Sequence, residues 1–145
     1  MTIAPPNFAA DLVAGLSDAL VFADKEGRIR VWNAGAERIF GFTAAEALGN
    51  TLDMIIPASL RARHSDGFSE TMRTGQTRYG NGDILSVPAL RKDGSRISVE
   101  FSIVPFTGAG GEMTGIAAVM RDVTARFEAL RALRTELAAL KAGQT

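Results

Sequence analysis

Two runs of strand-forming residues stand out near the start of this chain, at residues 19–23 and 28–32. They flank residues 24–27, a polar segment that ends in glycine. Gly27 can adopt the positive φ that a tight hairpin turn requires. The pattern therefore predicts a β-hairpin.

Alternation of apolar and polar residues is clearest between Arg96 and Phe106. There Ile97, Val99, Phe101 and Ile103 alternate with Ser98, Glu100 and Ser102. A period of two is typical of a strand with one buried face. An irregular strand is expected over 78–90 and a further strand over 113–120, with glycine-containing turns between the three. With the hairpin, these segments predict an antiparallel sheet of five strands.

Helical spacing is found in the segments that flank the hairpin. Residues 8–16 carry one apolar face, which predicts a short N-terminal helix. Asn33 can cap a helix that runs to Phe40, and Thr43 and Glu46 have the spacing of a capping box. We therefore expect two short helices directly after the hairpin.

A longer helix is predicted over residues 60–73, ended by Gly75. Apolar and aromatic residues recur four positions apart in it, so that they share one face. These residues are Leu60, His64, Phe68 and Met72.

The last part of the chain has leucines at helical spacing. Asp122-Val123-Thr124 lies where the last strand gives way to a helix, and Thr124 is the predicted N-cap. Apolar residues seven apart form an a/d seam made of Val123, Leu130, Leu133, Leu137 and Leu140. The seam predicts pairing with a second copy as a homodimer; the alternative is that the helix folds back on its own domain.

Composition excludes several classes of protein. The chain has 145 residues, enough for one domain, and 16 Lys plus Arg balance 16 Asp plus Glu. This balance gives no overall field for binding nucleic acid or an anionic membrane. Cysteine is absent, and no apolar stretch approaches the length of a membrane span or signal peptide. A cytoplasmic location is the expectation.

Three blocks of sequence occur in an order that resembles the PAS sensory domain. They are VWNAGAERIFGFTAAEALGN (31–50), PALRKDGSRISVEFSIVPF (88–106) and GIAAVMRDVTAR (115–126). The resemblance implies an α+β PAS fold with short helices on one face of the sheet, in which Trp32 and Phe40 pack in the core. It divides the chain into an N-terminal flanking helix (1–18), the PAS domain (19–122) and a C-terminal amphipathic or coiled-coil helix (123–145). The Asp122-Val123-Thr124 segment is similar to the joint through which PAS domains signal to an outgoing helix.

His64, the single histidine, lies in a segment similar to the helix that presents the axial ligand in haem-binding oxygen sensors of this family. The resemblance implies haem b, with His64 on the iron and Arg78 on a propionate. The cavity would be lined by Ile84, Leu85, Val87, Phe101, Ile103 and Met120. Where those sensors carry a distal arginine or methionine, this chain offers Leu85 or Ile84. An aliphatic distal wall favours carbon monoxide or nitric oxide over oxygen, because bound oxygen carries charge that needs a hydrogen bond.

Two other uses of the domain compete with haem. The pocket could take another small apolar ligand, or it could be filled by its own side chains in a module that dimerises or binds a separate kinase or regulator. Flavin photochemistry of the family's cysteine type is excluded because the chain has no cysteine. No phosphate-binding glycine loop is present, and a serine nucleophile would have only His64 as base. We therefore expect no enzymatic activity.

Overall fold

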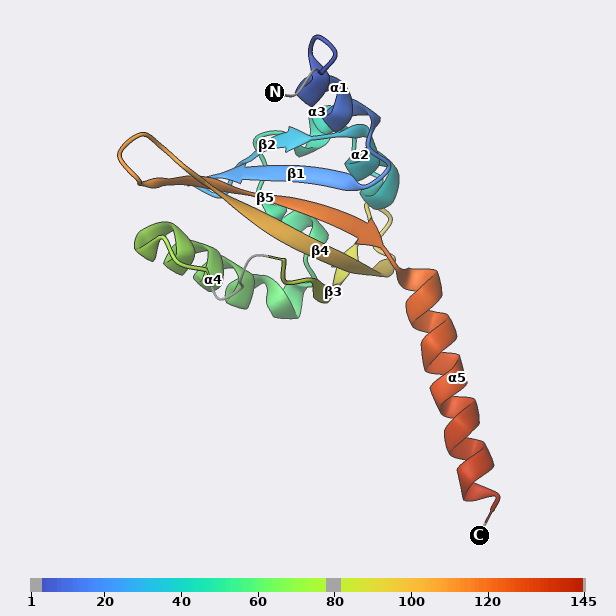
Figure 1. Cartoon of the computed structure of the whole chain (residues 1–145). Helices are drawn as coiled ribbons and strands as arrows, with labels where there is room; N and C mark the ends of the chain where they lie inside the picture. The colour runs from blue at the N-terminus through green and yellow to red at the C-terminus, as the bar shows by residue number, and fades with distance from the viewer. Residues whose placement is uncertain (1–3, 78–81, 145) are drawn as a thin grey trace.

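A computed structural model describes residues 4–77 and 82–144 (Figure 1). The strands are β1 (Ala19–Asp24), β2 (Ile29–Trp32), β3 (Leu85–Leu90), β4 (Arg96–Thr107) and β5 (Met113–Asp122). The helices are α1 (Phe8–Gly15), α2 (Ala34–Phe40), α3 (Ala44–Ala47), α4 (Arg61–Thr74) and α5 (Thr124–Ala142), with 3₁₀ turns at Leu52–Ile55 and Ala58–Leu60. The predicted α+β class and the order of its elements are confirmed.

All neighbouring strands pair antiparallel in one sheet, in the order β2-β1-β5-β4-β3. Val21 on β1 lies opposite Trp32 on β2 and opposite Ala118 on β5, and Ala118 lies opposite Ile103 on β4. Residues directly opposite each other in neighbouring strands project to the same face of a sheet. The register therefore joins apolar residues from both halves of the chain into one inner face.

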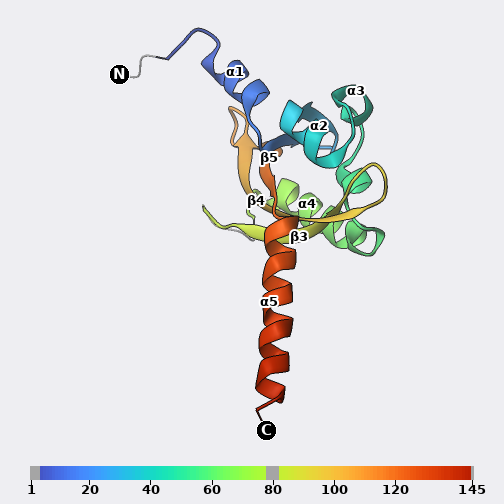
Figure 2. The same ribbon diagram turned by 90° about the vertical axis from the view of Figure 1, so that its right-hand side faces the viewer.

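The core lies between this inner face and the helices that follow β2. Figure 2 shows α2, α3 and α4 on the same side of the sheet. Trp32 and Phe40 are almost completely buried, with ring centroids 5.5 Å apart, which confirms their predicted packing role. The core cluster contains Ala19, Val21, Ile29, Trp32, Ala36, Phe40, Ala47, Ile55, Ala89, Ile97, Val99 and Met120.

Local caps set the ends of the short helices as the sequence predicts. The Asn33 side chain accepts a hydrogen bond from the Ala36 amide at 2.9 Å, which satisfies one free donor at the start of α2. Thr43 and Glu46 form the reciprocal capping box of α3. Gly75 ends α4 with a φ of 74°, a left-handed conformation that glycine adopts at little cost.

The predicted strand over 78–90 is too long. β3 begins only at Leu85, and within that range residues 78–81 lie outside the described part of the chain. Gly82 has a φ of 84°, which is incompatible with an extended strand. The backbone therefore turns before β3 begins.

The helix α5 does not fold back on the domain. None of its residues is buried, and Figures 1 and 2 show it projecting away from the sheet beyond the end of β5. The fold-back alternative is therefore wrong. None of the helices among the described residues combines the length and apolar character needed to cross a bilayer.

Candidate functional site

The N-terminal end of α4 is attached to the turns that precede it. Arg61 donates from Nε to the carbonyls of Asp53 (3.1 Å) and Ile56 (3.0 Å). A guanidinium that bridges two carbonyls fixes the direction in which the helix leaves the 3₁₀ turns, because its donors have a rigid planar geometry. One turn further along α4 lies His64.

The imidazole of His64 stacks on the ring of Phe68, as the four-residue spacing on α4 allows. Their ring centroids are 6.3 Å apart and the planes make an angle of 26°. Phe68 in turn lies against the β1–β2 turn, since a Cβ added to Gly27 would be 3.9 Å from its Cε1. This contact places Phe68 against the β1–β2 turn, while His64, one turn earlier on α4, is exposed.

His64 is exposed to solvent, and the protein around it also partly desolvates its imidazole. Its accessible surface is that of an exposed residue, while desolvation by the surrounding protein lowers its pKa and the Asp53 carboxylate acts in the opposite direction. Because the residue is exposed, a ligand can approach His64 from solvent. The lowered pKa favours neutral imidazole, the form that binds a metal.

The structure brings most of the predicted cavity residues onto the inner face of the sheet. Leu85 lies opposite Phe101, and Phe101 lies opposite Met120, while Val87 lies opposite the core residue Val99. Ile103 shares this face two residues beyond Phe101. These five side chains therefore share one face of the sheet, and their contact with a ligand stays a prediction.

Burial divides this set of side chains. Met120 is 7% exposed and belongs to the packed core. Leu85, Phe101 and Ile103 are only half-buried, and Val87 is 39% exposed. The β3–β4 part of the inner face is therefore an apolar surface that the protein's own side chains leave incompletely covered.

Two predicted cavity residues are not part of this surface. Ile84 precedes β3 and is 69% exposed, so the expectation that it lines a cavity is wrong. The reason is that the strand begins one residue later, after the turn at Gly82. Of the two distal candidates, Leu85 is thus the one on the inner face. Arg78, the predicted propionate partner, lies outside the described residues.

The joint between β5 and α5 is built differently from the predicted cap. Val123 occupies the N-cap position, and Thr124 is the first residue of α5. The Thr124 hydroxyl accepts a hydrogen bond from the Ser98 amide on β4 (2.9 Å) and donates to Asp122 (2.5 Å). The Asp122 carboxylate also accepts from the Thr124 amide at 2.9 Å. The prediction of Thr124 as N-cap is therefore wrong, because its hydroxyl is already used to hold the helix onto the sheet.

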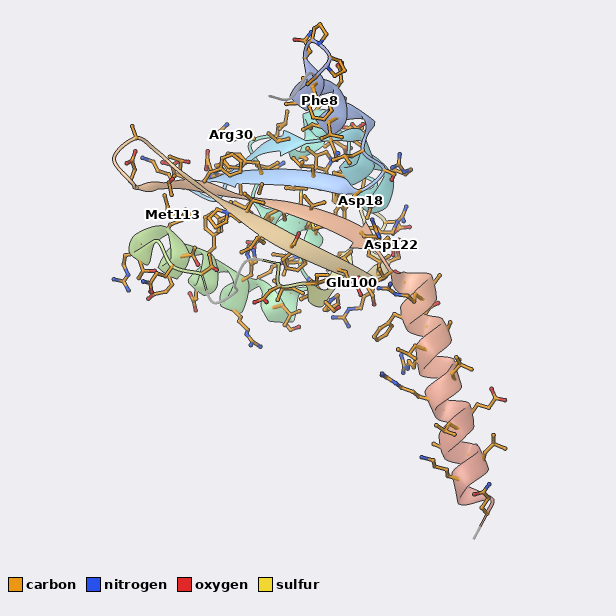
Figure 3. The ribbon with its side chains drawn as sticks, in the orientation of Figure 1. Phe8, Asp18, Arg30, Glu100, Met113 and Asp122 are labelled. Carbon is orange, nitrogen blue, oxygen red and sulfur yellow. The ribbon has the colours of Figure 1, made fainter. Side chains whose placement is uncertain are left out.

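Further ion pairs surround this joint, and sequence reasoning missed them. Arg121 pairs with Asp18, and Arg126 pairs with Glu100 on β4. Figure 3 shows Asp18, Glu100 and Asp122 gathered at the end of the sheet from which α5 leaves. The partners lie 103 and 26 positions apart, so they meet only when the strands and α5 have taken their places in the fold. Residue type and spacing carry no signal for such pairs, because the pairing depends on which strands become neighbours in the sheet.

Lys92, in the turn between β3 and β4, forms an ion pair with Glu46 of α3. Its Nζ lies 2.5 Å from Glu46 Oε2, whereas Glu37 accepts a hydrogen bond from the Ala44 amide at 2.7 Å. Within residues 4–77 and 82–144, no three His, Asp or Glu side chains gather into a metal site. His64 is therefore the imidazole on which a metal-containing cofactor would depend.

Comparison with known proteins identifies relatives over most of the chain. It is 34% identical over 117 residues to an uncharacterized protein of Azorhizobium caulinodans, and 31% identical over 127 residues to the sensor protein FixL of Bradyrhizobium diazoefficiens. These alignments cover 80% and 84% of this chain. The oxygen sensor protein DosP of Escherichia coli is 28% identical over 90 residues, or 62% of the chain. The chain spans only 16%, 24% and 11% of the lengths of these three relatives.

Solved structures agree on the fold. A PAS domain from Colwellia psychrerythraea superposes with a TM-score of 0.67 at 24% identity, covering 81% of this chain and 95% of that one. An RNA-binding light-oxygen-voltage receptor gives a TM-score of 0.70 at 23% identity, covering 99% of this chain and 42% of the receptor. The family model described as PAS domain matches residues 17–125. By its sequence and by the arrangement of its sheet and helices, the chain belongs to the PAS domain family.

Proposed function

We propose that this PAS domain, a sensory and signal-transduction module, binds haem b with His64 as axial ligand and acts as a gas or redox sensor. The observation that carries the proposal is that one domain holds both an exposed histidine on α4 and an incompletely covered apolar face on β3 and β4. The relatives named sensor protein and oxygen sensor protein support the sensory class.

The chemistry of the residues fits this cofactor. Haem is a flat apolar ring with one or two axial positions, and it requires a neutral imidazole beside apolar walls. His64 supplies the imidazole, and Leu85, Val87, Phe101 and Ile103 supply the wall. When bound, haem would supply an iron centre that responds to a diatomic gas or to a change in redox state.

The distal wall bears on the choice of gas. Leu85 stands on the inner face, and the family resemblance assigns to it the distal position at which other sensors carry a group that stabilises oxygen. An aliphatic side chain offers no such donor, which favours carbon monoxide or nitric oxide. We therefore propose that the domain discriminates against oxygen.

The route of the signal follows from hydrogen bonds at the joint. Ser98 on β4 donates its amide to the Thr124 hydroxyl, and its carbonyl accepts from the Val123 amide at 2.9 Å. The next residue along β4, Val99, projects to the inner face. A ligand-induced shift of β4 would therefore move the start of α5 directly, and the domain itself would regulate without catalysing a reaction.

An absorption spectrum tests the proposal. Wild type, His64→Ala and the exposed neighbour control Ser65→Ala are purified with haem supplied, and circular dichroism checks that each is folded. We expect a Soret band in wild type and Ser65→Ala that is lost or shifted in His64→Ala. An unchanged band in His64→Ala overturns the assignment of His64, and no band in any protein overturns haem.

A second candidate function needs no cofactor. The exposed leucines of α5 favour a PAS module that dimerises or binds a separate kinase or regulator, with or without another small apolar ligand in the pocket. Ligand binding to the folded state raises the melting temperature. A melting temperature that rises with a partner protein but not with haem or small apolar compounds would support this second function.

A further inference from the structure

We propose that Pro88 and Pro105 close the exposed edge of the sheet to strand addition, so that a second copy of this chain does not extend the sheet there. The edge is formed by β3 and by the last part of β4, where β3 has not yet begun. The inference depends neither on haem nor on pairing through α5.

The opposite edge of the sheet, at β2, is covered by the chain itself. Ile29 donates its amide to the carbonyl of Asn50 at 2.8 Å, and its carbonyl accepts from the Gly49 amide at 2.9 Å. A bridge between Arg28 and Thr51 continues this cover. Strand β3 is the last strand on the other side (Figure 1), so its outer backbone groups are the ones a further strand would use.

The backbone of Pro88 faces this outer side. Pro88 lies opposite Ser98 of β4, and the amide and carbonyl of Ser98 both bond at the β5–α5 joint instead. Positions that bond to the neighbouring strand alternate with positions that do not in an antiparallel pair. Arg91, three residues after Pro88, donates to the Ser95 carbonyl at 2.9 Å, which agrees with this alternation. The nitrogen of Pro88 therefore points away from β4.

A strand added at β3 would bond to residues 86, 88 and 90. Within residues 4–77 and 82–144, no backbone hydrogen bond is made by the amides of Ser86 and Leu90 on this outer side. Pro88 lies between them without an N–H, and its ring occupies the space that an incoming carbonyl would need. The added ladder would lose its central bond and meet a steric obstacle at the same point.

Pro105 has the same position on the continuation of this edge. Residues 102–107 of β4 pair with β5, while β3 begins only opposite Phe101. The register from Val99 to Phe106 is unbroken, and Pro105 lies an odd number of positions from Ser98, so its backbone faces away from β5. Both prolines in the strands of this sheet therefore have their missing donor on one edge.

An unprotected edge would be hazardous here because apolar surface lies beside it. Val87 is 39% exposed, and Leu85 and Phe101 are half-buried. An edge strand that combines exposed apolar side chains with free backbone groups is a template for pairing between copies. The two prolines let the β3–β4 face stay uncovered, as a ligand-binding surface must, without that pairing.

Restoring the missing donor tests the proposal. Pro88→Thr regains the N–H and introduces a residue that favours strands. The control Ser86→Thr places the same side chain two residues earlier on the same face of β3, where the N–H is already present. We expect sedimentation analysis to show self-association of Pro88→Thr at least several-fold stronger than that of wild type, with Ser86→Thr unchanged. Pairing through α5 is common to all three proteins and cancels in this comparison. Equal association of the three proteins, or an equal gain in Ser86→Thr, would overturn the proposal.

Hydrogen exchange locates the new contact. In associated Pro88→Thr, the amides of Ser86 and Leu90 should exchange several-fold more slowly than in wild type; association without this protection would place the contact elsewhere and overturn the proposal. Pro105→Thr is the second variant on the same edge and should also associate more strongly, with circular dichroism checking its fold. A folded Pro105→Thr that sediments as wild type would overturn the shared role of the prolines even if Pro88→Thr did not fold.

Discussion

Arg121 holds Asp18 across 103 positions of sequence, with Nε 3.2 Å from one carboxylate oxygen and an Nη 3.1 Å from the other. Asp18 lies between α1 and β1, and Arg121 is the residue before Asp122 in the exit joint. The pair therefore links the segment that leaves the N-terminal helix to the segment that enters α5. A displacement of the α1–β1 segment would therefore act on the β5–α5 joint through this ion pair, and the reverse also holds.

A double-mutant cycle on Asp18→Asn and Arg121→Gln should detect this link. Arg121 is largely exposed and its pKa is raised by the hydrogen bond to Asp18, so the coupling should be small and sensitive to salt. We expect urea unfolding to give a favourable coupling energy at low salt that falls toward zero at about 1 M salt. Strictly additive single variants at low salt would contradict the link.

Gly35→Ala should destabilise the domain strongly. A Cβ at Gly35 would lie 2.0 Å from the carbonyl oxygen of Asp18 and 2.9 Å from that of Ser17, and backbone cannot move aside as a flexible side chain can. We expect a loss of about 3 kcal/mol or more in the free energy of unfolding.

Gly67→Ala is the matched control for Gly35→Ala. It also lies in a helix, and a Cβ there would meet nothing within 4 Å. Because alanine favours the helix, we expect this variant to gain about 0.5–1 kcal/mol. Similar stabilities for the two variants in denaturant unfolding would show that the α1–β1 segment is not held against α2.

Stability should depend on pH through Glu46. Its hydrogen bond with Lys92, helped by the Thr43 amide, lowers its pKa from 4.5 to about 2. A carboxyl whose folded pKa is depressed stabilises the fold above its unfolded pKa, and this contribution is lost as the pH falls toward the folded value. Glu46→Gln should therefore melt below wild type near neutral pH.

The difference in melting temperature between Glu46→Gln and wild type should shrink as the pH falls from 4.5 toward about 2. Glu128→Gln, on the exposed surface of α5, is the control and should follow wild type throughout. A Glu46→Gln deficit that persists unchanged in acid would exclude the carboxylate as its source.

Thr124→Val should loosen the joint between the sheet and α5. Valine keeps the shape of threonine but leaves the part-buried Ser98 amide without its acceptor. A buried donor without a partner costs about 1–3 kcal/mol. We expect faster hydrogen exchange at the Ser98 amide and a lower free energy of unfolding.

Thr124→Ser retains the hydroxyl and should stay close to wild type in both measurements. Equal behaviour of the valine and serine variants would mean that the hydroxyl does not hold the helix. Loss of ligand-dependent signalling in the valine variant alone would support the proposed route from β4 to α5.

Local structure was predictable where the cause lies within a few residues. The capping box of Thr43 and Glu46, the turn at Gly27 and the alternation of burial at the start of β4 are all confirmed. Each depends on hydrogen bonds or side-chain directions between near neighbours, which the order of residues already specifies. The resemblance to PAS domains supplied the fold in which these pieces are arranged.

The positions of Leu85 and Ile84 were not predictable in the same way. Which of two adjacent aliphatic residues faces the core depends on where β3 starts to pair with β4, and a shift of one residue reverses the faces. For the same reason Arg121 and Asp18 could not be paired from sequence, since their contact exists only once β1 lies beside β5.

The sequence by itself determined the family, most of the helices and strands, the single imidazole and the leucine seam of α5, because these depend on residue type and spacing. The tertiary structure decided that His64 is reachable by solvent, that the β3–β4 face is incompletely covered and that Thr124 binds the sheet instead of capping its helix. These properties arise from contacts between segments far apart in the chain, and such contacts are set by how the sheet and helices pack together.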